Sequence, residues 1–399
     1  MPEGIGVAVI GAGMAGKAHA AGYRTAPTVY GSILPPIRYV SIGDVNQELG
    51  AATARRYGYE RTDATWQAIA EADDVDVVSV VVANHLHREI VEGLLAAGKH
   101  VLCEKPLSNS LEDARAMAVA AASASTVARI GFTFRRAPGL ATIRGLIKDG
   151  TLGRPLHLSG RYWTDYGASP STAMSWRFKG GPGSGALADV GSHLAYVAEF
   201  MSGDITSVSG GRLSTEITSR PLPLGAVVGH GHTEVSDVFD EVDNDDYATF
   251  SAQFEHGIGS LEVSRVAAGH PNSLILEVFC ENGSATFDQD RPSEIGLYLH
   301  GEKDTVNGFR RVMLGHDHPY VAGGMAIDVS GVGFGQNEPF IYQARAFLEE
   351  VAGISESESL PRNASFDDGV HNMEILAAVA ESARVDGASI SVAQKEPAL

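Results

Sequence analysis

Cysteine is scarce in this chain, and long apolar runs and an excess of basic residues are both missing. The only two cysteines among its 399 residues, Cys103 and Cys280, lie far apart and lack metal-ligand spacing. We expect both to be reduced core residues of a cytoplasmic protein. No stretch reaches the roughly 18 apolar residues that a membrane-spanning helix needs. The first residues also lack a basic segment, so no signal peptide is predicted.

The charge balance excludes further classes of partner. Lysine and arginine total 30 against 49 aspartate and glutamate residues, which gives a formal net charge of −19. Such a chain is repelled by nucleic acid and by anionic membrane surfaces. The length exceeds what one hydrophobic core usually serves, so two domains are expected. We therefore expect a soluble, two-domain protein with a small-molecule ligand.

A glycine-rich fingerprint stands directly behind the first apolar run. The run at residues 5–10 is followed by Gly11, Gly13 and Gly16 in GxGxxG spacing. The first glycine permits a tight turn, the second lets the backbone approach a pyrophosphate, and the third lets helix and strand pack closely. The N-terminus of the following helix offers free N–H groups to phosphates. The order of strand, fingerprint and helix predicts a dinucleotide-binding domain.

An acidic residue after the second predicted strand favours NAD over NADP. The strand is predicted at residues 37–42, and Asp44 follows it. A carboxylate at this position accepts hydrogen bonds from ribose hydroxyls and repels a 2′-phosphate. The interval from Gly16 is longer than usual, which a loop at residues 26–36 explains. Arg55 and Arg56 follow closely and weaken the preference for NAD.

The pattern of elements changes about one third of the way along the chain. Up to residue 132, buried strands alternate with helices in the manner of a parallel sheet. From residue 155 onward, short alternating strands with glycine punctuation predict an antiparallel sheet, flanked by helices at 192–201, 339–351 and 367–383. The predicted fold is a Rossmann domain over residues 1–132 and an α+β domain over 133–399. Residues 234–246 form an acidic run, which we interpret as a solvated loop or a guard at a sheet edge.

Several short motifs together resemble one family. They are Asn84-His85-Leu86-His87, Glu104-Lys105-Pro106, Gly131-Phe132-Thr133-Phe134-Arg135, Ser175-Trp176-Arg177 and Asp189-Val190-Gly191-Ser192-His193. Combined with the N-terminal fingerprint, they make the chain similar to the Gfo/Idh/MocA oxidoreductases. Members of that family join an N-terminal Rossmann domain to a C-terminal open antiparallel sheet. The resemblance spans nearly the whole length.

The resemblance implies a role for each motif. Lys105 would contact the reacting hydroxyl and support negative charge on its oxygen, and His193 would be the general base that accepts the hydroxyl proton. Asp189 would hold or tune this pair. Cofactor contacts are expected from Gly11, Gly13, Met14, Ala15, Gly16, Asp44, Val82, Asn84, His87, Glu104, Lys105, Trp176 and Arg177. Substrate contacts are expected from Lys105, Phe132, Arg135, Trp163, Tyr166, Asp189, His193, His318 and Gln336.

The implied activity is NAD-dependent oxidation of a ring hydroxyl to a ketone. A pyranose or an anhydrosugar such as levoglucosan is the first choice of substrate, and inositol is the second. Two other classes stay open: an enzyme that retains NAD and cleaves glycosides through an internal redox cycle, and a non-catalytic NAD-binding regulatory subunit. The pair His230-x-His232 has no evident third ligand, so no metal is expected. Relatives assemble through the C-terminal sheet, which implies a homodimer or homotetramer.

Overall fold

The computed structural model describes residues 4–29, 33–225, 227, 233–301, 307–322 and 324–394. The chain divides into two compact units: residues 1–136 with 315–370, and residues 137–314 with 371–399. The first unit therefore holds a C-terminal segment that the sequence assigned to the second domain. His230 and His232 lie outside the described residues. Within the described part, no helix has the length and apolarity to cross a membrane.

The first unit is built on a six-stranded parallel sheet of order β3-β2-β1-β4-β5-β6. Its strands are β1 (Ile5–Ile10), β2 (Ile37–Gly43), β3 (Arg61–Asp63), β4 (Val77–Val80), β5 (His100–Glu104) and β6 (Ala128–Gly131). The order reverses between β1 and β4, which is where open α/β sheets bind ligands beyond the carboxyl ends of their strands. The predicted Rossmann architecture is confirmed.

The described part of this unit contains six complete helices. They are α1 (Met14–Thr25), α2 (Gln47–Tyr57), α3 (Trp66–Glu71), α4 (His87–Ala96), α5 (Leu111–Ser123) and α8 (Glu338–Val351), with short 3-10 turns η1 (Ala26–Thr28), η2 (Asn84–Leu86) and η3 (Thr133–Arg136). Local chemistry sets several ends. The Asn46 side chain accepts a hydrogen bond from Leu49 N at the start of α2, and Gly58 ends that helix at a φ of 70°. These are the capping preferences of Asn and Gly.

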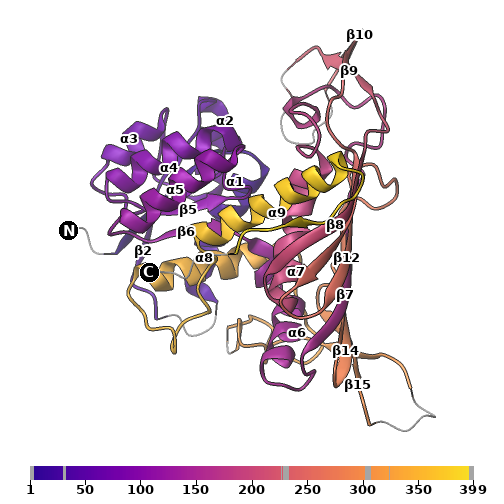
Figure 1. Cartoon of the computed structure of the whole chain (residues 1–399). Coiled ribbons are helices and arrows are strands. Elements are labelled where there is room, and N and C mark those ends of the chain that lie inside the picture. The colour runs from indigo at the N-terminus through magenta and orange to yellow at the C-terminus, as the bar shows by residue number, and fades with distance from the viewer. Residues whose placement is uncertain are drawn as a thin grey trace. The chain divides into compact units, whose positions relative to one another are not determined.

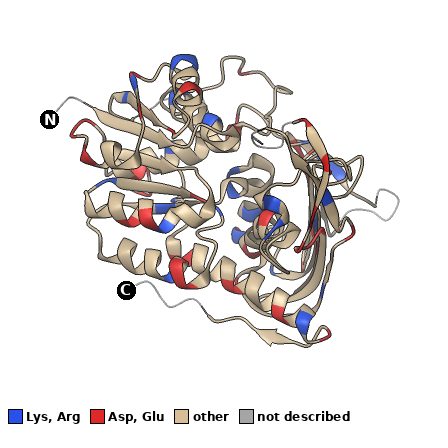
Figure 2. Cartoon of the chain, turned by 90° about the horizontal axis from the view of Figure 1, so that it is seen from above, with Lys and Arg blue, Asp and Glu red and all other residues tan. Residues whose placement is uncertain are grey.

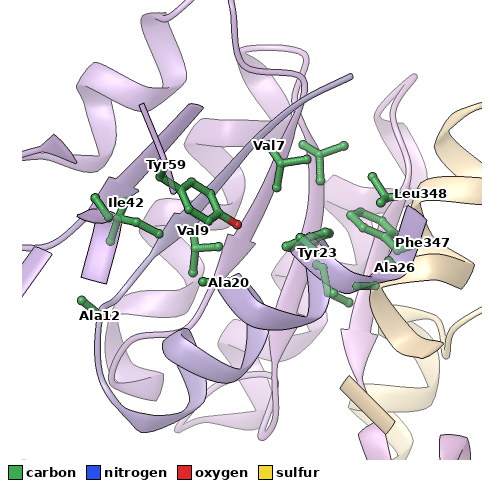
Figure 3. Packing of buried hydrophobic residues seen from close by; sticks show 14 residues of the cluster. Val7, Val9, Ala12, Ala20, Tyr23, Ala26, Ile42, Tyr59, Phe347 and Leu348 are labelled. Atoms are coloured by element: carbon green, nitrogen blue, oxygen red, sulfur yellow. The ribbon is translucent and has the colours of Figure 1, made fainter. Parts of the chain in front are cut away.

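Helix α8 is part of the first unit's core rather than of the second domain. Phe347 and Leu348 are fully buried in one cluster with Tyr23 and Ala26 of the N-terminal segment. Figure 3 shows these four side chains next to one another, with α8 entering from the C-terminal part of the chain. The Arg345 guanidinium donates to the Val29 carbonyl, which ties the same elements together. An apolar helical stripe shows that a helix is buried but not which sheet it covers, so the sequence placed α8 in the wrong domain.

The second unit contains a nine-stranded sheet of order β16-β15-β14-β13-β7-β12-β11-β8-β17, in which only β7 and β12 pair in parallel. Its strands are β7 (Pro155–Trp163), β8 (Ile205–Ser214), β11 (Tyr247–Phe254), β12 (Ile258–Ser264), β13 (Ser273–Cys280), β14 (Gly283–Asp288), β15 (Glu294–Leu299), β16 (Arg310–Met313) and β17 (Ile390–Ser391). Strands β9 (Ser219–Pro223) and β10 (Val235–Glu241) form a separate pair. The predicted, mainly antiparallel sheet is confirmed.

Helices cover one face of this sheet. They are α6 (Pro138–Lys148), α7 (Ser192–Ser202) and most of α9 (Phe366–Arg384), and Figure 1 shows the sheet edge-on with α6 and α7 along the same side. Strand alternation supplies the apolar face: Leu158, Gly160 and Tyr162 of β7 are buried, and Gly160 leaves room for Leu194 of α7. Cys103 and Cys280 are free and buried, as expected.

Replacing Phe347 tests the burial of α8 that its placement in the first unit requires. Phe347→Ala removes a fully buried ring from the cluster around Tyr23, and a cavity of this kind costs about 3–5 kcal/mol. Urea denaturation followed by circular dichroism should therefore show a large loss in the free energy of unfolding. Phe239→Ala is the matched control, because that ring is 57% exposed. Equal stability of the two variants would contradict this placement of α8.

Candidate active site

The glycine loop after β1 has the geometry of a phosphate cradle. Gly11 has a φ of +104°, and a Cβ there would lie 2.1 Å from the Val81 carbonyl oxygen. A Cβ on Gly16 would lie 1.8 Å from the Gly11 carbonyl oxygen, so helix and loop pack backbone against backbone. A Cβ on Gly13, in contrast, would meet no atom within 4 Å. The second glycine therefore keeps open the space that a pyrophosphate needs, and the loop fits a dinucleotide.

Asp44 is joined to this loop by hydrogen bonds. Its Oδ2 accepts a hydrogen bond from the Ala12 N–H at 2.7 Å, and its Oδ1 accepts one from the Asn46 N–H at 2.7 Å. The carboxylate therefore lies beside the glycine loop at the carboxyl end of β2, where a ribose is expected. Met14 and Ala15 form the first turn of α1, and the Met14 side chain is 69% exposed.

The structure separates Arg55 and Arg56 from this place. Both lie in the last turn of α2, whereas Asp44 precedes its first turn. Eleven helical residues rise about 16 Å, so the two guanidinium groups are at the opposite end of the helix. They do not supply the 2′-phosphate contact that would favour NADP.

The His87 side chain is buried and contacts backbone carbonyls rather than facing open space. The expected cofactor residues Val82 and Asn84 lie in the loop after β4, and both are half-buried. The His87 side chain is 1% exposed, with Nε2 3.1 Å from the Val82 carbonyl oxygen and Nδ1 3.1 Å from that of Leu107. Burial lowers the pKa of His87, so the ring is neutral. A neutral ring has one N–H, so His87 packs between two loops at the sheet edge and donates to a carbonyl of one of them.

Lys105 follows β5 above a buried polar chain. The Lys105 N–H donates to Glu104 Oε2 at 3.1 Å, while Glu104 Oε1 lies 2.9 Å from His19 Nε2. His19 Nδ1 lies 3.0 Å from the Ser79 hydroxyl, which is 2.9 Å from the hydroxyl of Tyr23. These contacts connect the backbone at Lys105 to α1, through His19 and Tyr23, and to β4, through Ser79. Sequence reasoning found Glu104 but gave no role to His19, Tyr23 or Ser79.

The Glu104 carboxylate is kept ionised by its surroundings. Burial alone raises the pKa of Glu104, but the hydrogen bond and charge of His19 and the charge of Lys105 outweigh it, so the pKa falls below its usual value. A fixed negative charge therefore lies next to Lys105. An ammonium group is a side-chain group that supports an oxyanion.

The remaining first-unit candidates lie in two segments. Phe132 and Arg135 follow β6 at the same sheet edge, with the Arg135 guanidinium carbon 5.1 Å from the Phe132 ring centre. His318 lies in the segment before α8, is 9% exposed, and packs edge-on against Tyr320 and Phe334. Gln336 is exposed. Phe132 is buried, so its ring serves to support Arg135.

A cluster of tyrosines surrounds Asp189 and His193 in the second unit. Asp189 lies in a π-helical turn, η5 (Leu187–Gly191), which leads directly into α7. The Tyr166 hydroxyl donates to Asp189 Oδ2 at 2.9 Å, and His193 Nδ1 lies 2.7 Å from the Tyr196 hydroxyl. The Tyr162 ring packs edge-on against His193, with ring centres 5.9 Å apart. Asp189, His193 and Tyr166 are thus brought together as expected, while Tyr162 and Tyr196 were missed.

The electrostatics of the cluster keep its tyrosines protonated. Burial and the Asp189 charge both raise the pKa of Tyr162 and of Tyr166. Tyr166 is therefore a permanent donor to Asp189. The His193 ring contacts the Tyr196 hydroxyl and the rings of Tyr162 and Tyr196.

Trp163 does not join this cluster. It neighbours Tyr162 on β7, so its side chain lies on the opposite face of the sheet. There its Nε1–H donates to Glu262 at 3.1 Å, and the Arg161 guanidinium lies 4.2 Å from its ring centre. The structure therefore places Trp163 on the other face of the sheet from Tyr162 and His193, because neighbouring strand residues point to opposite faces. Trp176 is 59% exposed and lies 4.5 Å from the Arg177 guanidinium carbon, an open position that remains compatible with a ligand contact.

The end of the acidic run is buried and supports the Asp189 turn. Asp245 Oδ1 accepts hydrogen bonds from the N–H groups of Gly183 at 2.8 Å and Gly185 at 3.0 Å, and Oδ2 accepts one from Leu187 at 2.7 Å. The Asp189 N–H in turn donates to the Gly185 carbonyl at 3.0 Å. We call this arrangement the Asp245 clamp. A solvated loop is therefore the wrong interpretation of residues 244–246.

The two neighbours of Asp245 hold the segment around Arg177. Asp246 is fully buried and lies 2.8 Å from Arg265 Nε, and Arg265 also donates to the Arg177 carbonyl at 2.8 Å. The Asn244 amide donates to the same carbonyl at 3.0 Å. Three consecutive residues of the acidic run therefore fix the backbone on both sides of the glycine-rich stretch at residues 180–185.

One group in the described part of the chain has ligand atoms at metal-binding spacing. Glu199, Asp204 and His371 bring their polar atoms within 4.8 Å of one another. Glu199 Oε1 already lies 2.8 Å from His371 Nε2 and accepts a hydrogen bond from Ile205 N at 3.0 Å. A protein-internal ion pair accounts for these contacts.

Comparison with known proteins agrees with this organisation. Residues 5–132 match the model of an oxidoreductase family with an NAD-binding Rossmann fold, and residues 140–286 match the GFO/IDH/MocA C-terminal domain. A levoglucosan dehydrogenase of Pseudarthrobacter phenanthrenivorans is 35% identical over 385 residues, which covers 96% of each chain. The scyllo-inositol 2-dehydrogenase (NAD(+)) of Bacillus subtilis is 26% identical over 286 residues, covering 71% of this chain and 74% of that one.

Solved structures give the same picture. A levoglucosan dehydrogenase in complex with NADH and L-sorbose has a TM-score of 0.88 at 32% identity, covering 98% of this chain and 99% of the other. A complex with NADH and levoglucosan has a TM-score of 0.86 at 32% identity, covering 98% and 100%. Sequence and structure agree over both units, and the chain belongs to the Gfo/Idh/MocA family of NAD-binding oxidoreductases.

Proposed function

We propose that this protein is an NAD-dependent dehydrogenase that oxidises a ring hydroxyl of a pyranose or anhydrosugar, with levoglucosan as the first candidate. The observation that carries the proposal is the likeness to a levoglucosan dehydrogenase over 96% of both chains. The glycine loop, Lys105 and His193 supply the groups that this reaction needs. Inositol is the second candidate, because an inositol dehydrogenase aligns over 71% of the chain.

In the proposed reaction His193 accepts the proton of the substrate hydroxyl. This role requires a lone pair on Nε2, so the ring proton must be on Nδ1 and be donated to the Tyr196 oxygen, 2.7 Å away. The same contact then steadies the imidazolium once the proton has been transferred. Asp189, held by Tyr166, supplies a negative charge close by on the same helical segment. Proton transfer to such a positioned base is typically worth about 10²–10⁴-fold in rate.

Lys105 supports the substrate oxygen in the same proposal. As the proton leaves, negative charge develops on that oxygen, and an ammonium group stabilises it. The Lys105 N–H donates to Glu104, and the contact of Glu104 with His19 fixes the backbone at this position. When bound, NAD supplies the acceptor for the hydride of the ring carbon. Gly13 and Asp44 are the residues that would hold its pyrophosphate and ribose.

Variants of Lys105 and His193 test the catalytic roles. Lys105→Ala and His193→Ala should each retain NADH binding, measured by nicotinamide fluorescence, while kcat with levoglucosan falls by about 10²–10⁴-fold. Trp163→Ala is the control, because that side chain lies on the other face of β7 and should leave kcat close to wild type. Near-normal turnover in either of the first two variants would overturn the roles proposed for them.

A substrate panel tests the choice of sugar. Reduction of NAD is followed by nicotinamide absorbance with levoglucosan, aldoses, methyl glycosides and inositols at alkaline pH. We expect the highest kcat/KM with levoglucosan or another pyranose. A preference for inositol would select the second candidate. Turnover of a glycoside with no net NADH, by a protein purified with bound cofactor, would instead indicate an internal redox cycle.

The Asp245 clamp yields a separate prediction for the Asp189 turn. Asp245→Asn replaces one acceptor oxygen by an amide that cannot accept from the facing N–H groups. Displacement of the turn should lower kcat by about 10- to 100-fold with a much smaller change in KM. Asp243→Asn is the matched control, since Asp243 is exposed and accepts one bond, from Gly181 N at 3.2 Å. Equal loss in both variants, or recovery of activity in Asp245→Ala, would contradict the clamp.

We also infer a cytoplasmic homo-oligomer that assembles through the nine-stranded sheet. The face of the sheet opposite α7 carries Trp163, Ile275 and Phe279 half-buried in the single chain, and Ile258 is 58% exposed. A second copy would cover these apolar side chains. Light scattering after gel filtration should give a dimer or tetramer, and Ile258→Glu combined with Ile275→Glu should give monomers. An unchanged mass in that double variant would exclude the sheet as the interface.

A further inference from the structure

A surface depression of about 360 Å³ lies in the first unit, away from the glycine loop. It is formed by the last turns of α1 and α2, and its polar lining consists of Arg24, Thr25, Arg55, Arg56, Tyr57 and Gly58. Both helices begin at the carboxyl edge of the parallel sheet, so this depression lies at the opposite edge. We call it the arginine basin.

The three arginines of the basin have no carboxylate partner among the described residues. Arg61, Arg88 and Arg129 of the same unit are all ion-paired. Arg24, Arg55 and Arg56 are exposed, and across the described parts of the chain none of them forms an ion pair. The chain holds 49 acidic residues, and Figure 2 shows them interspersed with the basic ones rather than gathered in one block. Three arginines without an ion pair therefore line one depression in a protein of net charge −19.

Aromatic rings fix two of these guanidinium groups and leave their donors available. The Arg24 Cζ lies 4.3 Å from the Tyr39 ring centre, and the Arg56 Cζ lies 5.5 Å from that of Tyr57. A guanidinium held over a ring keeps its N–H groups along the exposed edge. Within the described residues these arginines donate no hydrogen bond to protein. The basin thus presents several oriented donors that no protein group uses.

Helix capping does not account for this arrangement. Basic residues in a last turn do interact favourably with the helix dipole, by about 0.3–1 kcal/mol each. The end of α2, however, is already closed by Gly58, whose N–H donates to the Ala54 carbonyl. Tyr59 N donates to the same carbonyl at 2.9 Å. The dipole explains why arginines occur at each helix end, but not why three of them line one depression with their donors unused.

We propose that the arginine basin binds a phosphate dianion, either free or as the terminal group of a phosphomonoester. Guanidinium groups match the oxygens of such an anion with paired donors. The basin lies at the sheet edge opposite the glycine loop, so the site is separate from the cofactor site and independent of the proposed dehydrogenase activity. Occupancy removes the repulsion among the three arginines and links the ends of α1 and α2, so the ligand stabilises the first unit.

The test is calorimetric titration of the full chain, loaded with NADH so that the glycine loop is occupied. Inorganic phosphate and glycerol phosphate are titrated separately, with chloride replaced to hold ionic strength constant. We expect saturable binding of at least one of them and a loss of affinity of about tenfold or more in Arg24→Gln combined with Arg56→Gln, since two charge-assisted contacts are lost. Binding of only one compound identifies the free or the esterified form as the ligand.

A control variant and a second measurement distinguish binding at the arginine basin from a general effect of charge. Arg212→Gln removes an exposed arginine of β8 that has no ion pair in the described structure, and it should bind like wild type. Phosphate should also raise the melting temperature of wild type and of Arg212→Gln, but not that of the double variant, at constant ionic strength. Binding no better than chloride, or equal binding by the double variant, would overturn the proposal.

Discussion

The contact between Gly16 and the carbonyl of Gly11 sets the geometry of the first unit. A Cβ on Gly16 would lie 1.8 Å from that carbonyl oxygen, so only a glycine allows α1 to leave the loop in this direction. The direction of α1 then brings His19 to Ser79 and Glu104, and Tyr23 to the core that α8 completes. Gly16, which packs α1 against the glycine loop, therefore also positions the residues that contact Glu104 beside Lys105.

In the second unit, the Asp245 carboxylate fixes the backbone that leads to Asp189. The π-helical turn that carries Asp189 begins with N–H groups that have no helical partner, and Asp245 accepts three hydrogen bonds from this region. Gly185 is needed because a Cβ there would lie 2.0 Å from the Asp245 carbonyl oxygen. The close packing of Gly185 and the buried Asp245 carboxylate together fix the position of the turn. The positions of the Asp189 and His193 side chains therefore depend on Asp245, which lies about 50 residues further along the chain.

Sequence reasoning succeeded where a signal is local or has a fixed place in the fold. The strands predicted at residues 5–10 and 37–42 are found at Ile5–Ile10 and Ile37–Gly43, and Asp44 directly follows the second of them. Sequence reasoning failed for side chains whose role depends on contacts with residues distant in the sequence. Asp245 is acidic within an acidic run, and nothing nearby in sequence shows that three N–H groups surround it. Tyr196 and Tyr162 read as core residues of a helix and a strand, because their contacts with His193 arise only after folding.

The errors over α8 and Trp163 share a physical cause. An apolar stripe shows that a helix is buried but not which sheet it packs against. An aromatic residue in a strand likewise does not show which face of the sheet it lies on. Phe347 is buried whether α8 covers one sheet or the other, so only the three-dimensional contacts with Tyr23 and Ala26 assign it. Trp163 and Tyr162 are adjacent and both aromatic, yet the pleat sends them to opposite faces. Period-two alternation, applied outward from a buried neighbour such as Leu158, separates the two rings and excludes Trp163 from the histidine cluster.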